Sequence, residues 1–204
     1  MGAALRRNVY DELAALPEHL VGEILNGELE VSPRPRNRHG YTSRRVDRWL
    51  DPFEPESDPH DPSGWWFIVE PEVHLGDDVL VPDLAGWRRS RMPEIEDTAW
   101  FDLAPDWVCE ILSPSTARLD RHRKLPAYAR AGVGHAWLID VDAQTLEAYR
   151  LEGGRWLLVG VWAGSEVARI EPFDTMDFPL ERLWLPSTRK PPAPPAGGTS
   201  EGTG

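Results

Sequence analysis

The sequence predicts one α/β (α+β) domain, built on a mixed central β-sheet that is flanked by helices. Three observations support this fold class. An Asn-Gly turn separates two alternating apolar runs near the N-terminus, a strand–helix–strand pattern fills the middle of the chain, and further strands follow it. The length of 204 residues is typical of a single domain. We therefore expect residues 1–185 to form one domain.

The N-terminal part is predicted to contain a hairpin between two helices. Within Val21–Ser32, the dipeptide Asn26-Gly27 lies between the runs VGEIL and ELEVS. This dipeptide favours a type I′ turn, because both turn residues need a positive φ. A short helix is expected over Tyr10–Leu16 and a longer one over Asn37–Leu50, which has a rough apolar face. Residues 51–64 are rich in proline and acid and are predicted to form a loop.

The remaining strands alternate with turns and with one more helix. Strands are predicted at Trp65–Leu75, Val79–Trp87, Trp107–Leu112, His135–Val141, Thr145–Leu151 and Arg155–Val161, the last two forming a C-terminal antiparallel meander. The helix is expected over Ser115–Ala131, with a kink at Pro126 and an end at Gly132. It connects two strands that should be parallel, through a right-handed crossover. A last helical turn is expected over Phe178–Trp184, and residues 186–204 are predicted to be a disordered Pro/Gly-rich tail.

Composition excludes some classes of protein and leaves others open. A net charge of -12 argues against a general nucleic-acid coat protein, which needs lysine and arginine to hold phosphates. Two segments, 34–48 and 118–130, are nevertheless rich in arginine, and they are either solvated faces or patches that bind a polyanion. The chain has no apolar run of membrane-spanning length and no signal-peptide pattern. With a single cysteine, Cys109, we expect a cytoplasmic protein.

A carboxylate inside a predicted buried strand is the strongest functional signal. Glu110 lies in the apolar run WVCEIL, and strand alternation places it on the same face as Val108 and Leu112. A buried carboxylate is costly unless it is paired or bound to a metal. The alternative is that Glu110 points to solvent or pairs with an arginine. Its apolar neighbours weaken that alternative, so we interpret Glu110 as a functional residue.

Two more positions extend this site. Asp83 interrupts the run VLVPDL, and Pro82 before it implies a strand edge, bulge or end, where an aspartate is also an ordinary turn residue. Asp120, Lys124 and Tyr128 share one helix face, which is either a surface ion pair or a way to bring Lys124 to Glu110. Two carboxylates and a lysine suit metal-assisted hydrolysis of a phosphodiester, because Mg²⁺ prefers oxygen ligands and activates its bound water.

The segments VPDLAGW, WVCEILSPST and AGVGHAWLID, with the Asp, Lys and Tyr of the helix, resemble the putative restriction endonuclease family of the PD-(D/E)XK nuclease superfamily. The resemblance extends over roughly Tyr10 to Leu185. It implies a restriction-endonuclease-like core and a Mg²⁺ (or Mn²⁺) dependent nuclease that acts on DNA. It implies that Asp83 and Glu110 hold the metal with the Ile111 carbonyl, and that Glu23 completes the acidic cluster.

The lysine of the superfamily pattern stands two residues after the glutamate, where this chain has Leu112. The resemblance therefore implies that Lys124 replaces it from the following helix, and it gives His39 a supporting place. The arginines expected to follow the DNA phosphates are Arg36, Arg38, Arg44, Arg45, Arg121 and Arg123.

Three functions remain open at this point. The first is a Mg²⁺-dependent DNA endonuclease, for which a homodimer is a compatible assembly because enzymes that cut both strands commonly act in pairs. The second is a catalytically inactive nuclease-fold module that binds nucleic acid or protein, which the negative charge and the displaced lysine favour. The third is a two-carboxylate hydrolase such as a glycosidase, which only the pair of Asp83 and Glu110 supports.

Overall fold

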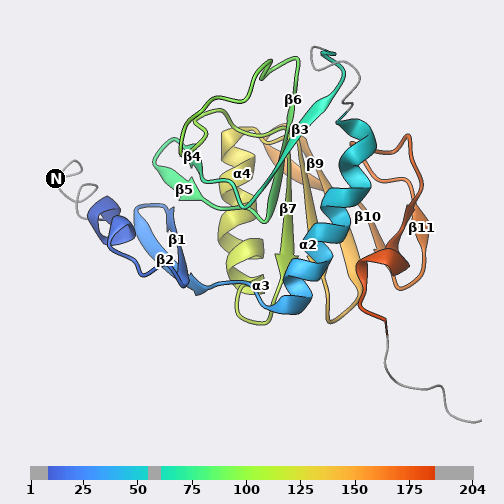
Figure 1. Ribbon diagram of the computed structural model, residues 1–204, viewed down its shortest axis with the longest axis horizontal. Helices are drawn as coiled ribbons and strands as arrows, with labels where there is room; N and C mark the ends of the chain where they lie inside the picture. The colour runs from blue at the N-terminus through green and yellow to red at the C-terminus, as the bar shows by residue number, and fades with distance from the viewer. Residues whose placement is uncertain (1–8, 55–60, 187–204) are drawn as a thin grey trace, which may run out of the picture.

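The structure is a computed structural model, and it describes residues 9–54 and 61–186. Its centre is a six-stranded mixed sheet with the strand order β10-β9-β8-β7-β6-β3 (Figure 1). The strands are β3 (Trp65–Val69), β6 (Leu84–Arg88), β7 (Trp107–Leu112), β8 (His135–Asp140), β9 (Thr145–Glu152) and β10 (Arg155–Ala163). Only β7 and β8 run parallel within this sheet, and the other neighbours are antiparallel. The mixed sheet and the parallel central pair confirm the predicted fold class.

A smaller antiparallel sheet with the order β2-β1-β5-β4 stands beside the central one. Its strands are β1 (Leu20–Leu25), β2 (Glu28–Pro33), β4 (Val73–Leu75) and β5 (Asp78–Leu80). β1 and β2 form the predicted hairpin, and Asn26 and Gly27 have φ values of 55° and 81°. These positive angles are those that an Asn-Gly turn of type I′ requires. A helix over residues 9–14 precedes the hairpin, close to the expected position.

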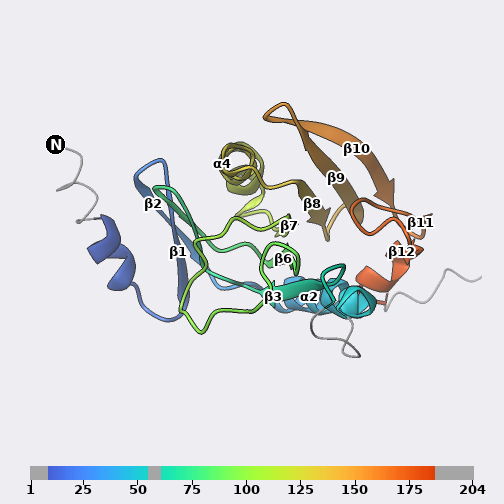
Figure 2. The ribbon, with the colours of Figure 1, turned by 90° about the horizontal axis from the view of Figure 1, so that it is seen from above.

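Helices cover both faces of the central sheet (Figure 2). α2 (Asn37–Leu50), which has the predicted bounds, packs on one face and buries Val46 and Leu50 against Cys109 and Ile111 of β7. The second helical segment lies on the opposite face, where Tyr128 packs with the other β7 residues. The alternation expected along β7 is therefore confirmed, and each face of this fully buried strand has its own core.

The two long strands predicted at 65–75 and 79–87 are each broken, and that prediction was wrong in this respect. They form one long hairpin that bends from the central sheet into the small one. The register continues across the bend, since Val69 lies opposite Leu84 in one sheet and Val73 opposite Leu80 in the other. Pro82 lies in the bend because proline has no N–H to donate to a sheet.

The second helix is one continuous segment with a wider turn inside it. α3 (Ala117–Leu119) leads into a π-helical turn, η2 (Asp120–Lys124), and then α4 (Leu125–Ala131), which ends at Gly132 with φ 79°. The expected end at Gly132 is confirmed. The predicted kink takes the form of the π turn, in which the Leu125 N–H reaches the Asp120 carbonyl just before Pro126. Such turns accommodate a break in the regular helical ladder and are frequent at functional sites.

The C-terminal part contains the predicted meander, β9 and β10, followed by short elements. The helical turn expected at Phe178–Trp184 is instead a strand, β12 (Phe178–Pro179), paired with β11 (Val167–Ala168), and then a 3₁₀ turn, η3 (Leu180–Leu183). A 3₁₀ turn, η1 (Asp51–Phe53), also begins the predicted 51–64 loop.

The predicted disordered tail lies, apart from its first residue, outside the described residues. No helix in the described part is long and apolar enough to cross a membrane.

Gly86 in β6 is expected to be required for packing of the central sheet. A Cβ atom at this position would lie 2.9 Å from a ring carbon of Phe67 and 3.3 Å from one of Trp107. Gly86→Ala should therefore lower the free energy of unfolding by about 1–3 kcal/mol, measured by urea denaturation. Gly40→Ala is the matched control, because Gly40 lies in α2 with open space around it, and alanine there should stabilise by up to about 1 kcal/mol. Equal effects of the two substitutions would contradict this account of the packing.

Candidate active site

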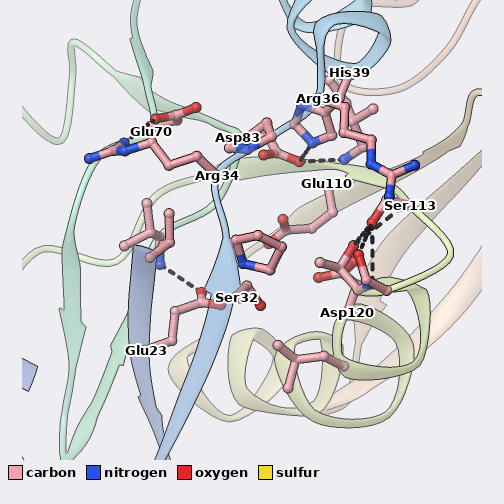
Figure 3. A pocket seen from close by; sticks show the side chains of 18 of the residues that line it. Glu23, Ser32, Arg34, Arg36, His39, Glu70, Asp83, Glu110, Ser113 and Asp120 are labelled. Atoms are coloured by element: carbon pink, nitrogen blue, oxygen red, sulfur yellow. Dashed lines mark hydrogen bonds and ion pairs between the residues drawn. The ribbon is translucent and has the colours of Figure 1, made fainter. Parts of the chain in front are cut away.

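The residues predicted from the sequence meet in one cavity of about 540 Å³ at the junction of the two sheets. Figure 3 shows that Glu23, Asp83 and Glu110 approach it from three different segments. Glu23 belongs to β1, Asp83 to the bend of the long hairpin, and Glu110 to β7. Lys124 from η2 lines the same cavity, and so does His39 from α2. Tertiary structure thus brings together all four residues predicted to be catalytic.

Lys124 is the central contact of this site. Its Nζ lies 2.8 Å from Glu110 Oε1 and 2.9 Å from Glu23 Oε1, and it donates to the Val81 carbonyl at 3.1 Å. The lysine is only 3% exposed. These three oxygens satisfy the three hydrogen-bond donors of its ammonium group. The backbone N–H of Val81 also donates to Glu23 Oε1 at 2.8 Å. One ammonium therefore ties together β1, the hairpin bend, β7 and the helical segment.

The charges around Lys124 shift the pKa values of the site. Burial by itself lowers the pKa of Lys124, but the Glu110 and Glu23 carboxylates outweigh it and hold that pKa well above its ordinary value. Burial raises the pKa of the Glu110 carboxyl, the Lys124 ammonium opposes this rise, and the carboxylates of Asp120, Asp83 and Glu23 add to it. Tyr128 donates its hydroxyl to Glu110 Oε1 at 2.5 Å, and burial raises its pKa, so it remains a donor. Lys124 is thus a fixed positive charge.

Asp83 is held where β6 no longer covers the edge of β7. The pairing between these strands ends at Leu84 opposite Cys109, and the Ile111 N–H donates to Asp83 Oδ2 at 2.6 Å instead. His39 Nε2 lies 3.0 Å from the same oxygen. In a strand, the N–H and the carbonyl of one residue point to the same side. The Ile111 carbonyl therefore faces this uncovered edge, where the residue lines the cavity.

Carboxylate side chains line the cavity and supply oxygen atoms that can bind a metal ion. In each of the three acids, the contacts made within the described part of the chain fall on a single carboxylate oxygen, which is Glu23 Oε1, Asp83 Oδ2 or Glu110 Oε1. The second oxygen of each acid is left for a ligand. Carboxylate and carbonyl oxygens are the ligands that Mg²⁺ and Mn²⁺ prefer. The donor chemistry therefore fits such an ion.

The acids are not already gathered around one point. No group of three His, Cys, Asp or Glu side chains in the described residues stands close enough to hold an ion together. This spacing agrees with Mg²⁺ chemistry, because Mg²⁺ keeps several waters and commonly takes only one or two protein carboxylates. Two carboxylates and the Ile111 carbonyl would suffice, with water and substrate oxygens in the other positions.

Asp120 is a site residue whose role the sequence did not assign, although its helix position placed it on the face of Lys124. It lines the cavity, is 4% exposed and lies 3.9 Å from Lys124 Nζ. Burial raises its pKa to about 6, although the Lys124 ammonium and a hydrogen bond with Thr116 lower it. Glu23, Glu110 and Asp120 form ion pairs with the one Lys124 ammonium, and Asp83 lines the same cavity, so carboxylates outnumber the buried ammonium. That excess favours a second cation.

The arginines predicted to contact DNA fall into two groups. Arg36 lines the cavity and Arg44 is exposed on α2. The others make contacts within the protein: Arg121 forms two bonds of 2.7 Å with Glu147, Arg123 pairs with Glu28 and Glu30, Arg38 pairs with Asp142, and Arg45 donates to the Arg182 carbonyl. A phosphate would have to compete with these partners. The DNA-binding role of all six arginines remains a prediction.

The geometry agrees with the comparison with known families. The model of the Uma2 family, described as "Putative restriction endonuclease", matches residues 10–181. The chain belongs to this nuclease family. The matched range includes every residue of the candidate site.

A solved structure shows the same fold. It is described as a putative nuclease belonging to DUF820 from Anabaena variabilis ATCC 29413, and it is 24% identical to this chain. The alignment has a TM-score of 0.67 and covers 85% of this chain and 95% of the other. The restriction-endonuclease-like fold is thus shown, and at this identity the likeness concerns the fold alone. A search of curated proteins found no match.

Removal of the Lys124 charge is expected to destabilise this Uma2 protein strongly. Lys124→Met would leave Glu23 and Glu110 buried without a counter-charge, at a cost of about 3–5 kcal/mol near pH 8. The loss should be smaller near pH 5, because burial raises the pKa of the Glu110 carboxyl, which then takes up a proton in the folded state. Urea denaturation at both pH values measures this. Arg130→Met, which removes an exposed partner of Asp78, should cost less than about 1 kcal/mol.

Asp120 is expected to make the stability fall as the pH rises. Its pKa is about 6 in the folded protein and 3.8 by its ordinary value, so the folded state binds this proton more tightly. The penalty develops between these two values and reaches about 3 kcal/mol at higher pH. Asp120→Asn should therefore be more stable than wild type at pH 8, with the difference vanishing towards pH 4. An asparagine variant that is less stable across the whole range would contradict the assigned pKa.

Proposed function

We propose that this protein is a Mg²⁺-dependent (or Mn²⁺-dependent) endonuclease that hydrolyses phosphodiester bonds of DNA. The observation that carries the proposal is one cavity lined by four carboxylates, three of which form ion pairs with the Lys124 ammonium. Three of these acids each keep one oxygen without a partner among the described residues. Such an arrangement is destabilised by its own negative charge, and a divalent cation would relieve it. The family membership supports nuclease chemistry for the same residues.

Asp83, Glu110 and the Ile111 carbonyl are proposed to hold the metal. All three residues line the same cavity, and the 2.6 Å bond from the Ile111 N–H fixes the orientation of Asp83. A divalent ion bound there would lower the pKa of its water and neutralise charge on the phosphate. Glu23 also pairs with Lys124 and lines the same cavity, where it is proposed to complete the acidic wall. His39, whose Nε2 contacts Asp83, limits the rotation of that carboxylate.

Lys124 and Asp120 are proposed to serve different steps. Because its pKa is raised, Lys124 stays protonated and acts as a fixed positive charge that stabilises the extra negative charge of the transition state. It does not act as a base. Asp120 has a pKa of about 6, so it changes its protonation state near neutral pH. It is therefore the group in this cavity that is best suited to exchange a proton with water.

A catalytically inactive module that binds nucleic acid or protein is the second candidate. It is favoured by Lys124, which already neutralises part of the acidic cluster, and by the ion pairs of Arg121 and Arg123. This candidate predicts binding without turnover and no thermal shift with divalent ions. The glycosidase alternative gains no support from the family of the chain.

Nicking of supercoiled plasmid in Mg²⁺ or Mn²⁺, with an EDTA control, tests the proposal. Glu110→Gln and Asp83→Asn, which keep the side-chain shape, should each reduce nicking by on the order of 100-fold or more. Glu152→Gln, an exposed glutamate paired with Arg150 at the far end of β9, should leave the rate unchanged. Intact plasmid with every divalent ion, or equal nicking by Glu110→Gln, would reject the nuclease and favour the binding module.

A further inference from the structure

A second cavity of about 550 Å³ opens beside the first. The two cavities share Val21, Arg34, Glu70 and Val81 in their linings, so they are contiguous. The boundary between them carries the ion pair of Arg34 and Glu70 at 3.6 Å (Figure 3). Both partners are partly exposed, so this ion pair is weak enough for a ligand to displace. The volume lies within the range of sites that hold small organic groups.

One wall of the second cavity is a fixed aromatic platform. The indole of Trp100 lies parallel to the imidazole of His74, with ring centroids 5.0 Å apart and planes 7° from parallel. The neighbouring Phe101 is bonded to β4 on both sides, by its N–H to the Glu72 carbonyl and by its carbonyl to the His74 N–H. Trp100 is nevertheless 43% exposed, so much of its ring surface is available. An exposed tryptophan that is held in place costs little entropy to bind against.

The charges of this cavity decide which part of a nucleotide fits it. Glu18, Glu70 and Glu72 line it, and Arg34, the lining arginine, is already engaged by Glu70 and by the Glu18 carbonyl. Such a wall repels a phosphate. It accepts hydrogen bonds from the amino groups of a base, as carboxylates do from cytosine. The base stacks on an aromatic face whatever its sequence.

We infer that this second cavity receives an unpaired base of the strand whose phosphodiester bond lies in the first cavity. The inference rests on the proposed function for the position of that bond. A base can stack on Trp100 only after it has left the double helix, because its faces are covered within a duplex. Once the exposed ion pair with Glu70 opens, Arg34 at the boundary would contact the phosphate that links the two positions. The substrate class is then DNA with unpaired nucleotides, such as a single strand or a flap, and not continuous duplex.

The experiment measures binding in EDTA, so that cleavage cannot interfere. The probe is a single-stranded oligonucleotide carrying 2-aminopurine, with a duplex of the same sequence as the reference. We expect fluorescence quenching on binding, and a preference for the single strand. Trp100→Ala should weaken single-strand binding about tenfold and abolish the quenching, and Trp100→Phe should retain most of both. Leu103→Ala is the matched control, since it is 36% exposed in the same loop and lies outside both cavity linings.

Several results would overturn the inference. They are an absence of quenching, no preference for the single strand, and a Trp100→Ala variant that loses single-strand and duplex binding equally or loses neither. An arginine-rich peptide that binds through Trp100 while the oligonucleotide does not would assign the cavity to a protein partner instead. Plasmid nicking separates this inference from the proposed function. Trp100-dependent binding without nicking would reject only the proposed nuclease activity. Nicking without Trp100-dependent binding would reject only the proposed base-binding site.

Discussion

The buried ammonium of Lys124 is the interaction on which the site depends. It joins β1 of the small sheet, the hairpin bend, β7 of the central sheet and the helical segment, through contacts of 2.8 to 3.1 Å with three oxygens. Taking a charge out of water costs several kcal/mol, so the lysine can be buried only because all three of its donors are satisfied. The same contacts bring Glu23 and Glu110 to one ammonium in the wall of the cavity. Stability and the candidate chemistry therefore share one group.

A bend in one hairpin provides the second constraint. Had Trp65–Leu75 and Val79–Trp87 been two unbroken strands, β6 would have continued along β7 and covered its edge at Ile111. Pro82 ends the pairing at that point, and the Ile111 N–H donates its hydrogen bond to the Asp83 side chain instead. The uncovered edge is what makes a backbone carbonyl available to a ligand. The bend also moves β4 and β5 into the small sheet, where β4 carries His74 beneath Trp100.

The candidate site differs from the superfamily pattern in the element that supplies its lysine. Leu112, at the position of the patterned lysine, is an apolar core residue here, packed in the same cluster as Tyr128. The ammonium arrives from η2 instead and still meets Glu110. A positive charge thus lies beside the acids although it comes from a different element, the π turn before Pro126. The Asp120 carboxylate enters the cavity from the same turn.

The sequence by itself determined the elements that depend on local patterns. The Asn26-Gly27 hairpin, the bounds of α2, the buried strand β7 and the end at Gly132 follow from turn chemistry and apolar periodicity, which act over a few residues. It also identified Glu110, because a carboxylate in an apolar run needs a partner. Only the tertiary structure decided which partner that is, where the long hairpin bends, and that Asp120 and a second cavity lie beside the acids. These are contacts between residues far apart in the chain, and they depend on packing and on charge in three dimensions, which no local pattern records.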